Sequence, residues 1–337
     1  MINFIQFITT RAFLAIITLL AVSFIIFALM ELVPANCAER YLAFKNTQGS
    51  NITIEDIEAE ERRLGLDRPF LVRWSTWVSN IVIERDFGNS CILRVRINDL
   101  MKDKFILSLG ICLTALLLAY LIAVPVGIIS ATTKFRSLDN ALKLISYLGL
   151  AIPNFLLALI IILFSVVFFG DTMTGLFTPE YVNAPWSFDK FKNFLSRAWL
   201  PIFILGWSAT AFALQTVRAL ISDEYEKLYV VAAKARGISG MTLLWKYPAR
   251  HSLGPVINSL GFDLNRIFNE LPIVALILML TESGALLVES LARTNDQQLA
   301  GAIIILLTGT IIMLNFLTDV LLAVIDPRIR KGVMGGS

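Results

Sequence analysis

The sequence contains few of the side chains that catalytic and metal-binding sites require. Only 16% of its 337 residues are charged, against about 25% in an average soluble chain, and there are one histidine and three cysteines. One histidine does not make a usual metal site, and three cysteines do not make a zinc ribbon or a disulfide scaffold. Neither the Walker pattern for ATP nor the metalloprotease pattern H-E-x-x-H occurs. The sequence therefore predicts no catalytic residue, no metal and no cofactor in this chain.

Long hydrophobic runs dominate the chain. Apolar residues make up 56% of it and the mean hydropathy is +0.72, which favours membrane lipid, while a net charge of +3 does not favour nucleic acid as a partner. A helix that crosses a bilayer needs about 20 mostly apolar residues. Segments of this kind cover 12–33, 105–131, 144–169, 199–217, 253–281 and 298–325. Because none alternates in polarity as barrel strands do, the sequence predicts an all-α integral membrane protein with six transmembrane helices.

The distribution of lysine and arginine predicts the orientation. Basic residues favour short cytoplasmic loops, and they concentrate in the short loops that are cytoplasmic if the N-terminus is inside. Six spans then place both termini in the cytoplasm. The first apolar run is longer than the core of a signal peptide and no A-x-A site follows it, so this helix is expected to be retained. The expected regions are a first helix (1–33), an outside segment (34–104), a core with five helices (105–327) and a cytoplasmic tail (328–337).

The outside segment carries signals for ordered structure. Thr53 followed by Asp56 predicts a helix start with a capping box, and Gly65 fits the left-handed cap at the end of that helix. A second helix is expected over about 71–83. Its apolar face is predicted either to pack on the spans or to lie at the membrane surface, and the two interpretations are compatible.

Two of the three cysteines, Cys37 and Cys91, fall in the outside segment, and Cys112 falls in the second span. In an oxidising compartment a Cys37–Cys91 disulfide would close a loop of about 55 residues and tie the first helix to the outside segment. The alternative is a pair of free thiols that lie too far apart to bond.

The loop 223–251, between the fourth and fifth spans, has the most informative pattern. Ser222 is expected to cap a helix, and Gly237 can adopt the left-handed conformation that ends it. The apolar residues of this helix at helical spacing are Leu228, Val231, Ala232 and Ala235. A second short helix follows up to Pro248, and its apolar residues are Leu243, Leu244 and Trp245. One interpretation is that the loop docks on a partner, and the other is a surface-lying or re-entrant hairpin that serves only topology.

Several sequence strings resemble those of a known family. Ala232, Ala233 and Gly237, with the later Pro255, resemble the "EAA" loop of ABC importer permeases. The string Y-V-V-A-A-K-A-R-G at 229–237 resembles the Y-V-x-x-A-R-A-K-G string of dipeptide and oligopeptide permeases. Further resemblances follow in the family's order: L-G-L-D-R-P at 64–69, D-F-G-N-S at 86–90, I-P-N-F at 152–155, N-F-L-T-D at 315–319 and D-P-R-I-R at 326–330. The match extends along nearly the whole chain.

The resemblance implies the permease subunit of a bacterial ABC importer of the dipeptide, oligopeptide and nickel type, with a type I permease fold in the inner membrane. It implies a second homologous permease subunit that completes a heterodimer, and a periplasmic solute-binding protein. It also implies two cytoplasmic ATPase subunits that bind ATP and Mg²⁺ and drive alternating access. The residues that it assigns to the ATPase-coupling loop are Tyr229, Ala232, Ala233, Gly237, Ile238, Ser239, Leu243, Leu244 and Arg250.

The chain departs from the family pattern after the fifth span. Thr281 and Glu282 stand where the family often has P-G, and Ala275 stands where it often has glutamate. A small peptide is the expected substrate, and an oligosaccharide or another non-peptide solute is the alternative. An ATP-independent channel and a membrane scaffold are the alternatives from other classes, and the coupling-type loop argues against both.

Charged residues inside the fifth predicted span point to a buried polar face. Asp263, Arg266 and Glu270 have the spacing i, i+3, i+7 and share one side of a helix. A charge at bilayer depth costs at least about 2.5–3.5 kcal/mol and usually faces a cavity or a partner. The face is expected to be an ion-pair ladder between helices or a polar lining of the translocation path, unless the span boundary lies elsewhere. Asp319 in the sixth span is a further candidate for the path.

Overall fold

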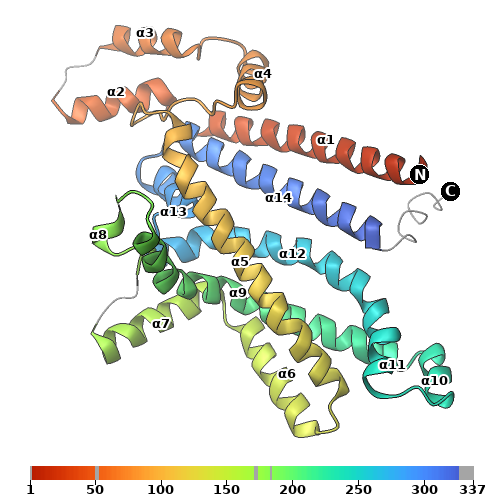
Figure 1. The fold of residues 1–337 in the computed structure, drawn as a ribbon. Helices are drawn as coiled ribbons and strands as arrows, with labels where there is room; N and C mark the ends of the chain where they lie inside the picture. The colour runs from red at the N-terminus through yellow and green to blue at the C-terminus, as the bar shows by residue number, and fades with distance from the viewer. Residues whose placement is uncertain (1, 50–52, 171–173, 183, 326–337) are drawn as a thin grey trace. The chain divides into compact units, whose positions relative to one another are not determined.

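The computed structural model describes residues 2–49, 53–170, 174–182 and 184–325 (Figure 1). The expected tail 328–337 and the D-P-R-I-R string at 326–330 lie outside these residues. Helices make up most of the described chain, which contains no β-strand beyond an isolated bridge between Asn89 and Arg96. The all-α prediction is confirmed.

The helices follow one another along the chain in this order: α1 (Ile2–Leu32), α2 (Cys37–Thr47), α3 (Ile54–Leu64), α4 (Phe70–Ser79), α5 (Ile97–Thr132), α6 (Arg136–Ala151), α7 (Asn154–Phe169), α8 (Pro179–Val182), α9 (Phe188–Tyr225), α10 (Leu228–Ala235), α11 (Gly240–Lys246), α12 (Pro248–Ile277), α13 (Ser283–Val288) and α14 (Gln297–Ile325). Single π-helical turns extend α4 over Asn80–Glu84 and α13 over Glu289–Arg293.

The chain forms two compact units. Unit 1 consists of Met1–Arg11, Leu109–Leu280 and Leu314–Ser337, and unit 2 consists of Ala12–Ser108 and Thr281–Met313. Unit 2 therefore contains the predicted outside segment together with most of α1, the start of α5, α13 and the first part of α14.

Among the described residues, four helices are long and apolar enough to cross a membrane: α1, α5, α9 and α14. The pair α6 and α7 counts as a fifth candidate if it is one span, but its two helices meet at an angle of 97°. The predicted single helix over 144–169 is therefore wrong. Pro153 has no N–H to donate and disfavours helical backbone at Ile152, which is extended with φ −91° and ψ 113°.

The predicted fifth span corresponds to α12, which does not meet the apolar criterion for a span because charged residues interrupt it. The structure thus supports four or five candidate spans by length and composition, and the count of six remains a prediction.

Close helix contacts hold unit 1 together, with α9 packed on α6, α7 and α12. Small residues permit this approach. A Cβ on Gly149 of α6 would lie 2.6 Å from the Cβ of Ala211, and a Cβ on Gly206 of α9 would lie 3.2 Å from the carbonyl oxygen of Ala115 in α5. At the predicted cytoplasmic end, the guanidinium of Arg218 donates to the carboxylate of Asp139 over 2.8 Å and joins α9 to α6.

In unit 2, the end of α1 packs against α4 and α14. Ile26, Phe27, Trp77 and Ile305 form the buried cluster of this contact. The indole N–H of Trp74 also donates to Ser23 over 3.3 Å, so one face of α4 packs on α1, as one interpretation of this helix predicted. The capping box at the start of α3 and the left-handed Gly65 at its end are both present, which confirms these two predictions.

Candidate functional site

The loop that joins α9 to α12 begins later than the sequence predicts. α9 continues to Tyr225, and α10 starts after Lys227, whose backbone is extended. Ser222 therefore lies inside α9, and its predicted role as an N-cap is wrong. The reason is tertiary packing, because Ile221 is buried with Leu244 of α11 and Ala249 of α12, which holds the last turn of α9 in helical form.

Gly237 ends α10 in the predicted left-handed conformation, with φ at +84°. The N–H of Gly237 donates to the carbonyl of Lys234 over 2.9 Å, and the N–H of Ile238 donates to the carbonyl of Ala233 over 3.2 Å. These two bonds form a Schellman motif, which redirects the chain into α11. A Cβ on Gly237 would meet no atom within 4 Å, so this position requires glycine for its backbone conformation and not for space.

The inner side of the loop is fixed to the helices beneath it. Leu243 of α11 is buried with Val230 and Ala233 of α10. Leu244 is buried with Ile221 of α9 and packs toward the start of α12. Leu243 and Leu244, expected to present apolar surface to a partner, are therefore internal packing residues, because each faces a neighbouring helix.

The outer side of the loop is an exposed apolar surface. We call it the loop apolar surface, and its residues are Leu228, Val231, Ala232, Ala235, Met241 and Trp245. Leu228 is 86% exposed and Trp245 is 60% exposed. Figure 1 shows α10 and α11 together at the end of α9 and α12. The whole stripe predicted on α10 belongs to this surface. The sequence reasoning missed Met241, although its i, i+4 spacing to Trp245 was a usable signal.

The other assigned loop residues surround this surface. The ring of Tyr229 lies 5.1 Å from that of His251 and 6.2 Å from that of Tyr247, which fixes the start of α10 near the start of α12. Ile238 is half-buried, and the remaining members are exposed: Gly237, Ser239 and Arg250. The structure thus brings all the assigned residues into one loop but divides them between an inner and an outer side.

The charged face of α12 does not form an ion-pair ladder in the described chain. Asp263 is buried and accepts a hydrogen bond from the hydroxyl of Tyr120 over 2.8 Å. The guanidinium of Arg266 lies over the ring of Phe212 at 5.4 Å, and its Nε and Nη2 atoms are buried without a hydrogen-bond partner. Arg266 therefore retains N–H donors on this face of α12 that no other described side chain uses.

Glu270 has a different role from its neighbours on α12. The side-chain amide of Asn154 donates to its carboxylate and also to the hydroxyl of Ser208 over 3.1 Å. Asn154 directly follows Pro153, so these bonds fix the break between α6 and α7 to α9 and α12. The sequence string I-P-N-F marked this position but did not indicate that Glu270 is its partner.

Asp319 of α14 forms an ion pair with Arg11 of α1, with Nη1 and Oδ2 3.2 Å apart. Both residues belong to unit 1. This contact gives Asp319 a partner within the chain and is a packing alternative to its predicted place in the path.

Two buried acidic side chains in unit 2 cap helices. Glu282 accepts from the N–H groups of Gly284 and Ala285 over 2.7 and 3.1 Å and from the hydroxyl of Ser108. Burial raises the pKa of Glu282. Asp296 accepts from the N–H of Leu299 over 3.0 Å at the start of α14 and from the hydroxyl of Ser90. Glu282, which with Thr281 stands where the family often has P-G, therefore has a local structural role.

Cys37 and Cys91 are joined by a disulfide, with their Cα atoms 5.3 Å apart. The bond connects the start of α2 to the residue that follows Ser90. Because the Ser90 hydroxyl donates to Asp296 at the start of α14, these contacts connect three separate stretches of unit 2.

Comparison with protein families decides the class of the chain. Residues 123–331 match the family described as "Binding-protein-dependent transport system inner membrane component". Residues 4–95 match the N-terminal family of the same membrane components. The chain belongs to this family. It is a multi-pass membrane permease component of an ABC importer, in which ATP hydrolysis belongs to separate subunits.

Curated relatives match almost the whole permease. It is 27% identical over 326 residues to the oligopeptide transport system permease protein AppB of Bacillus subtilis, covering 96% of this chain and 99% of AppB. It is 28% identical over 313 residues to the glutathione transport system permease protein GsiC of Escherichia coli, covering 93% and 95%. It is 27% identical over 276 residues to the putrescine export system permease protein SapB of E. coli, covering 77% and 86%.

A solved structure shares the permease fold. An inward-facing structure of the MetNI methionine ABC transporter matches with a TM-score of 0.53 and 16% identity. The match covers 67% of this permease and 96% of the compared chain. At this identity the likeness supports the fold alone.

Proposed function

We propose that this permease forms one half of the path of an ATP-driven importer for small peptides or related solutes. Relatives named for oligopeptide and glutathione transport support a peptide substrate. The departure from the family pattern at Glu282 was one reason to consider a non-peptide solute. Because Glu282 is buried and caps α13, this departure has a structural explanation and gives that alternative less support. Specificity is expected to reside in a solute-binding protein that docks on the outside regions 34–104, 170–198 and 282–297.

The observation that carries the coupling proposal is the loop apolar surface. Exposed Leu228 and Trp245 lie on a loop that the positive-inside rule assigns to the cytoplasm, where they are away from lipid. Exposed apolar patches of this kind mark protein-protein contacts. We assign this surface to one of two cytoplasmic ATPase subunits, which bind ATP and Mg²⁺.

The inner side of the loop supplies a mechanical connection. Leu243 packs on α10, and Leu244 packs on α9 near the start of α12. When the ATPases close, a push on residues 238–247 is therefore transmitted to α9 and α12. The path would then alternate between outward and inward openings. A second, homologous permease completes the translocation path. The polar face of α12 around Arg266 is our candidate for the lining of this path.

A pair of substitutions at Gly237 tests the coupling role. Gly237→Val places a β-branched residue at φ +84°, which we expect to distort the Schellman motif and abolish ATP-dependent uptake. Gly237→Asn is the matched control, because asparagine tolerates left-handed backbone far better. Both variants should reach the membrane, since nothing within 4 Å obstructs the added Cβ. Normal uptake by the valine variant would contradict the coupling role.

A further inference from the structure

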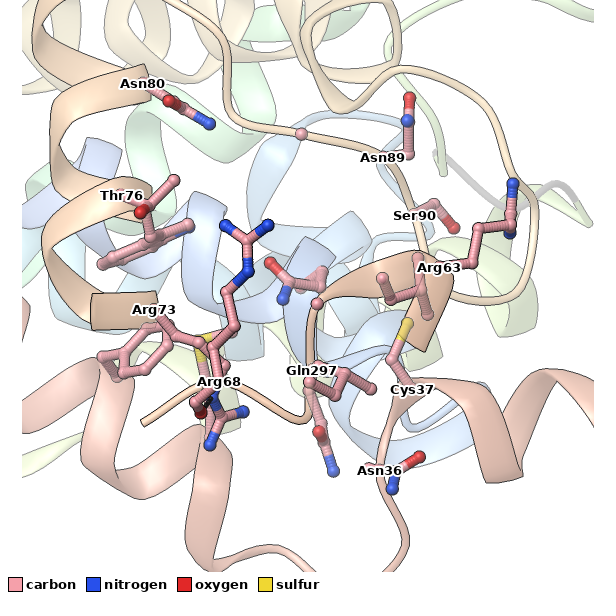
Figure 2. Close-up of a pocket in the computed structure, with 18 of the residues that line it drawn as sticks. Asn36, Cys37, Arg63, Arg68, Arg73, Thr76, Asn80, Asn89, Ser90 and Gln297 are labelled. Atoms are coloured by element: carbon pink, nitrogen blue, oxygen red, sulfur yellow. Dashed lines mark hydrogen bonds between the residues drawn. The ribbon is translucent and has the colours of Figure 1, made fainter. Parts of the chain in front are cut away.

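Unit 2 contains a cleft of about 770 Å³ that lies beside the disulfide (Figure 2). Two carboxylates, Glu31 and Asp86, line the cleft. Its five arginines outnumber them by three positive charges: Arg62, Arg63, Arg68, Arg73 and Arg94. Figure 2 shows Arg68 and Arg73 on one side of the opening and Arg63 on the other. The cleft is a separate feature from the coupling loop, which belongs to unit 1.

Part of this charge is neutralised within the chain. Arg73 forms a bidentate ion pair with Glu31. Glu60 forms ion pairs with both Arg63 and Arg94, and its Oε2 lies 2.8 Å from Nε of Arg63. The hydrogen bond from Arg63 lowers the pKa of Glu60, so this carboxylate is ionised at neutral pH.

Among the described residues, the groups of the cleft that remain without a partner are cationic side chains and N–H donors. In the described part of the chain, Arg62 and Arg68 have no ion pair. The indole N–H of Trp77 and the Nε of Arg94 are buried in the lining without a hydrogen-bond partner. A buried donor without a partner is costly, so the chemistry that would complete this cleft is an anion rich in acceptor oxygens.

The position of the cleft along α1 indicates its depth in the membrane. Phe27, Met30 and Glu31 line the cleft, and they lie in the last turns of the candidate span Phe4–Leu32. The end of a bilayer-spanning helix lies at the level of the lipid headgroups. Two apolar residues close in sequence to the lining are exposed: Leu32, which follows Glu31, is 76% exposed, and Leu71, three residues after Arg68, is 62% exposed. Arginines next to exposed apolar side chains suit the boundary between headgroups and acyl chains.

We propose that this cleft binds the phosphodiester headgroup of an anionic phospholipid in the leaflet where α1 ends. The fork of an arginine guanidinium matches phosphate oxygens, which Arg62 and Arg68 are free to contact. The indole N–H of Trp77 supplies a further donor, and Leu32 and Leu71 contact the acyl chains. The inference rests on α1 crossing the bilayer and not on the transported substrate, so its failure would leave the importer assignment unchanged.

The test uses the assembled transporter, purified in mild detergent and titrated with lipid under native mass spectrometry. Phosphatidylglycerol should bind and phosphatidylcholine should not. The double variant Arg62→Gln/Arg68→Gln should weaken phosphatidylglycerol binding about 30-fold, since each basic side chain near an anionic surface contributes about fivefold. Arg85→Gln is the matched control, because Arg85 is exposed in the same segment but does not line the cleft. It should bind as the wild type does.

Other occupants give different results. If soluble glycerophosphate binds as tightly as phosphatidylglycerol, the site takes a free anion and the lipid assignment is wrong. If the double variant keeps its lipid but loses the solute-binding protein, the cleft belongs to an acidic protein surface and the proposal is also wrong. If the double variant does not assemble, the test is a competition experiment on the wild type. Displacement of bound phosphatidylglycerol by high salt, but not by phosphatidylcholine, supports the site. Phosphatidylglycerol binding that resists high salt overturns the proposal.

Discussion

Replacing Leu228 by serine should separate docking of the ATPase from folding of the permease. Leu228 is 86% exposed at the start of α10, so the chain itself gains little from its side chain. A substitution at such a position usually changes the free energy of unfolding by no more than about 0.5 kcal/mol. The predicted effect of Leu228→Ser therefore lies in the contact with the partner.

The size of this effect follows from the exposed side chain. Burial of a whole leucine side chain contributes about 1.5–3 kcal/mol. Nearly all of this contribution is available to a partner that covers Leu228, so its loss should cost about 2 kcal/mol. That difference corresponds to a Kd about 30-fold higher.

The assay titrates permease in nanodiscs with its purified ATPase subunits and measures the Kd together with the stimulation of ATP hydrolysis. Leu138→Ser is the matched control, because Leu138 is an exposed leucine on a different predicted cytoplasmic loop. Leu243→Ser should also impair docking, but with a lower Tm, since Leu243 is buried. A Kd for Leu228→Ser within twofold of the wild type would refute the docking surface.

Three further perturbations test packing and charge. Cys91→Ser breaks the bond to Cys37 and should destabilise unit 2 by about 2–4 kcal/mol, whereas an unchanged Tm without reductant would contradict a bonded pair. Gly149→Ala places its Cβ 2.6 Å from an α9 Cβ and should cost about 1–3 kcal/mol. Gly110→Ala, with nothing within 4 Å, should not lower the Tm, because alanine favours helix over glycine; equal Tm values for the two variants would refute this packing. The hydrogen bond from Arg63 lowers the pKa of Glu60, so its stabilisation is present at neutral pH and is lost as the pH falls through the lowered pKa of the folded state. The protection factors of the α3 amides, which correct for the intrinsic pH dependence of exchange, should therefore fall on acidification in the wild type but not in Glu60→Gln, and identical profiles would contradict this role.

Helix ends were predictable where neighbouring residues determine them. The capping box at Thr53 and the left-handed glycines Gly65 and Gly237 are present as the sequence predicts. Each of these motifs depends on side chains and backbone within one turn of a helix, so a single sequence is sufficient to identify it.

Features that depend on neighbouring helices were not predictable in the same way. Ser222 has the chemistry of an N-cap, but burial of Ile221 extends α9 past it. Spacing placed leucines on α11 without indicating that Leu243 faces α10 and Leu244 faces α9. In a helix of this length, the surrounding helices determine which side is inward.

The polar face of α12 illustrates both cases. Its i, i+3, i+7 spacing is a property of the helix and was evident from the sequence. The partners of its residues are Tyr120, Phe212 and Asn154, which lie far away along the chain. The 97° bend before Asn154 had a local signal in Pro153, but the continuous hydrophobicity of 144–169 suggested a straight span.

The central claim is that the α10–α11 loop couples this permease to ATPase subunits, and one measurement tests it most directly. The tagged chain is purified from its native membrane in mild detergent, and co-purifying proteins are identified by mass spectrometry. Coupling predicts Walker-motif ATPases, as two different subunits or two copies of one, together with a second permease. A permease that purifies stably with its sister subunit but without any ATPase would contradict it.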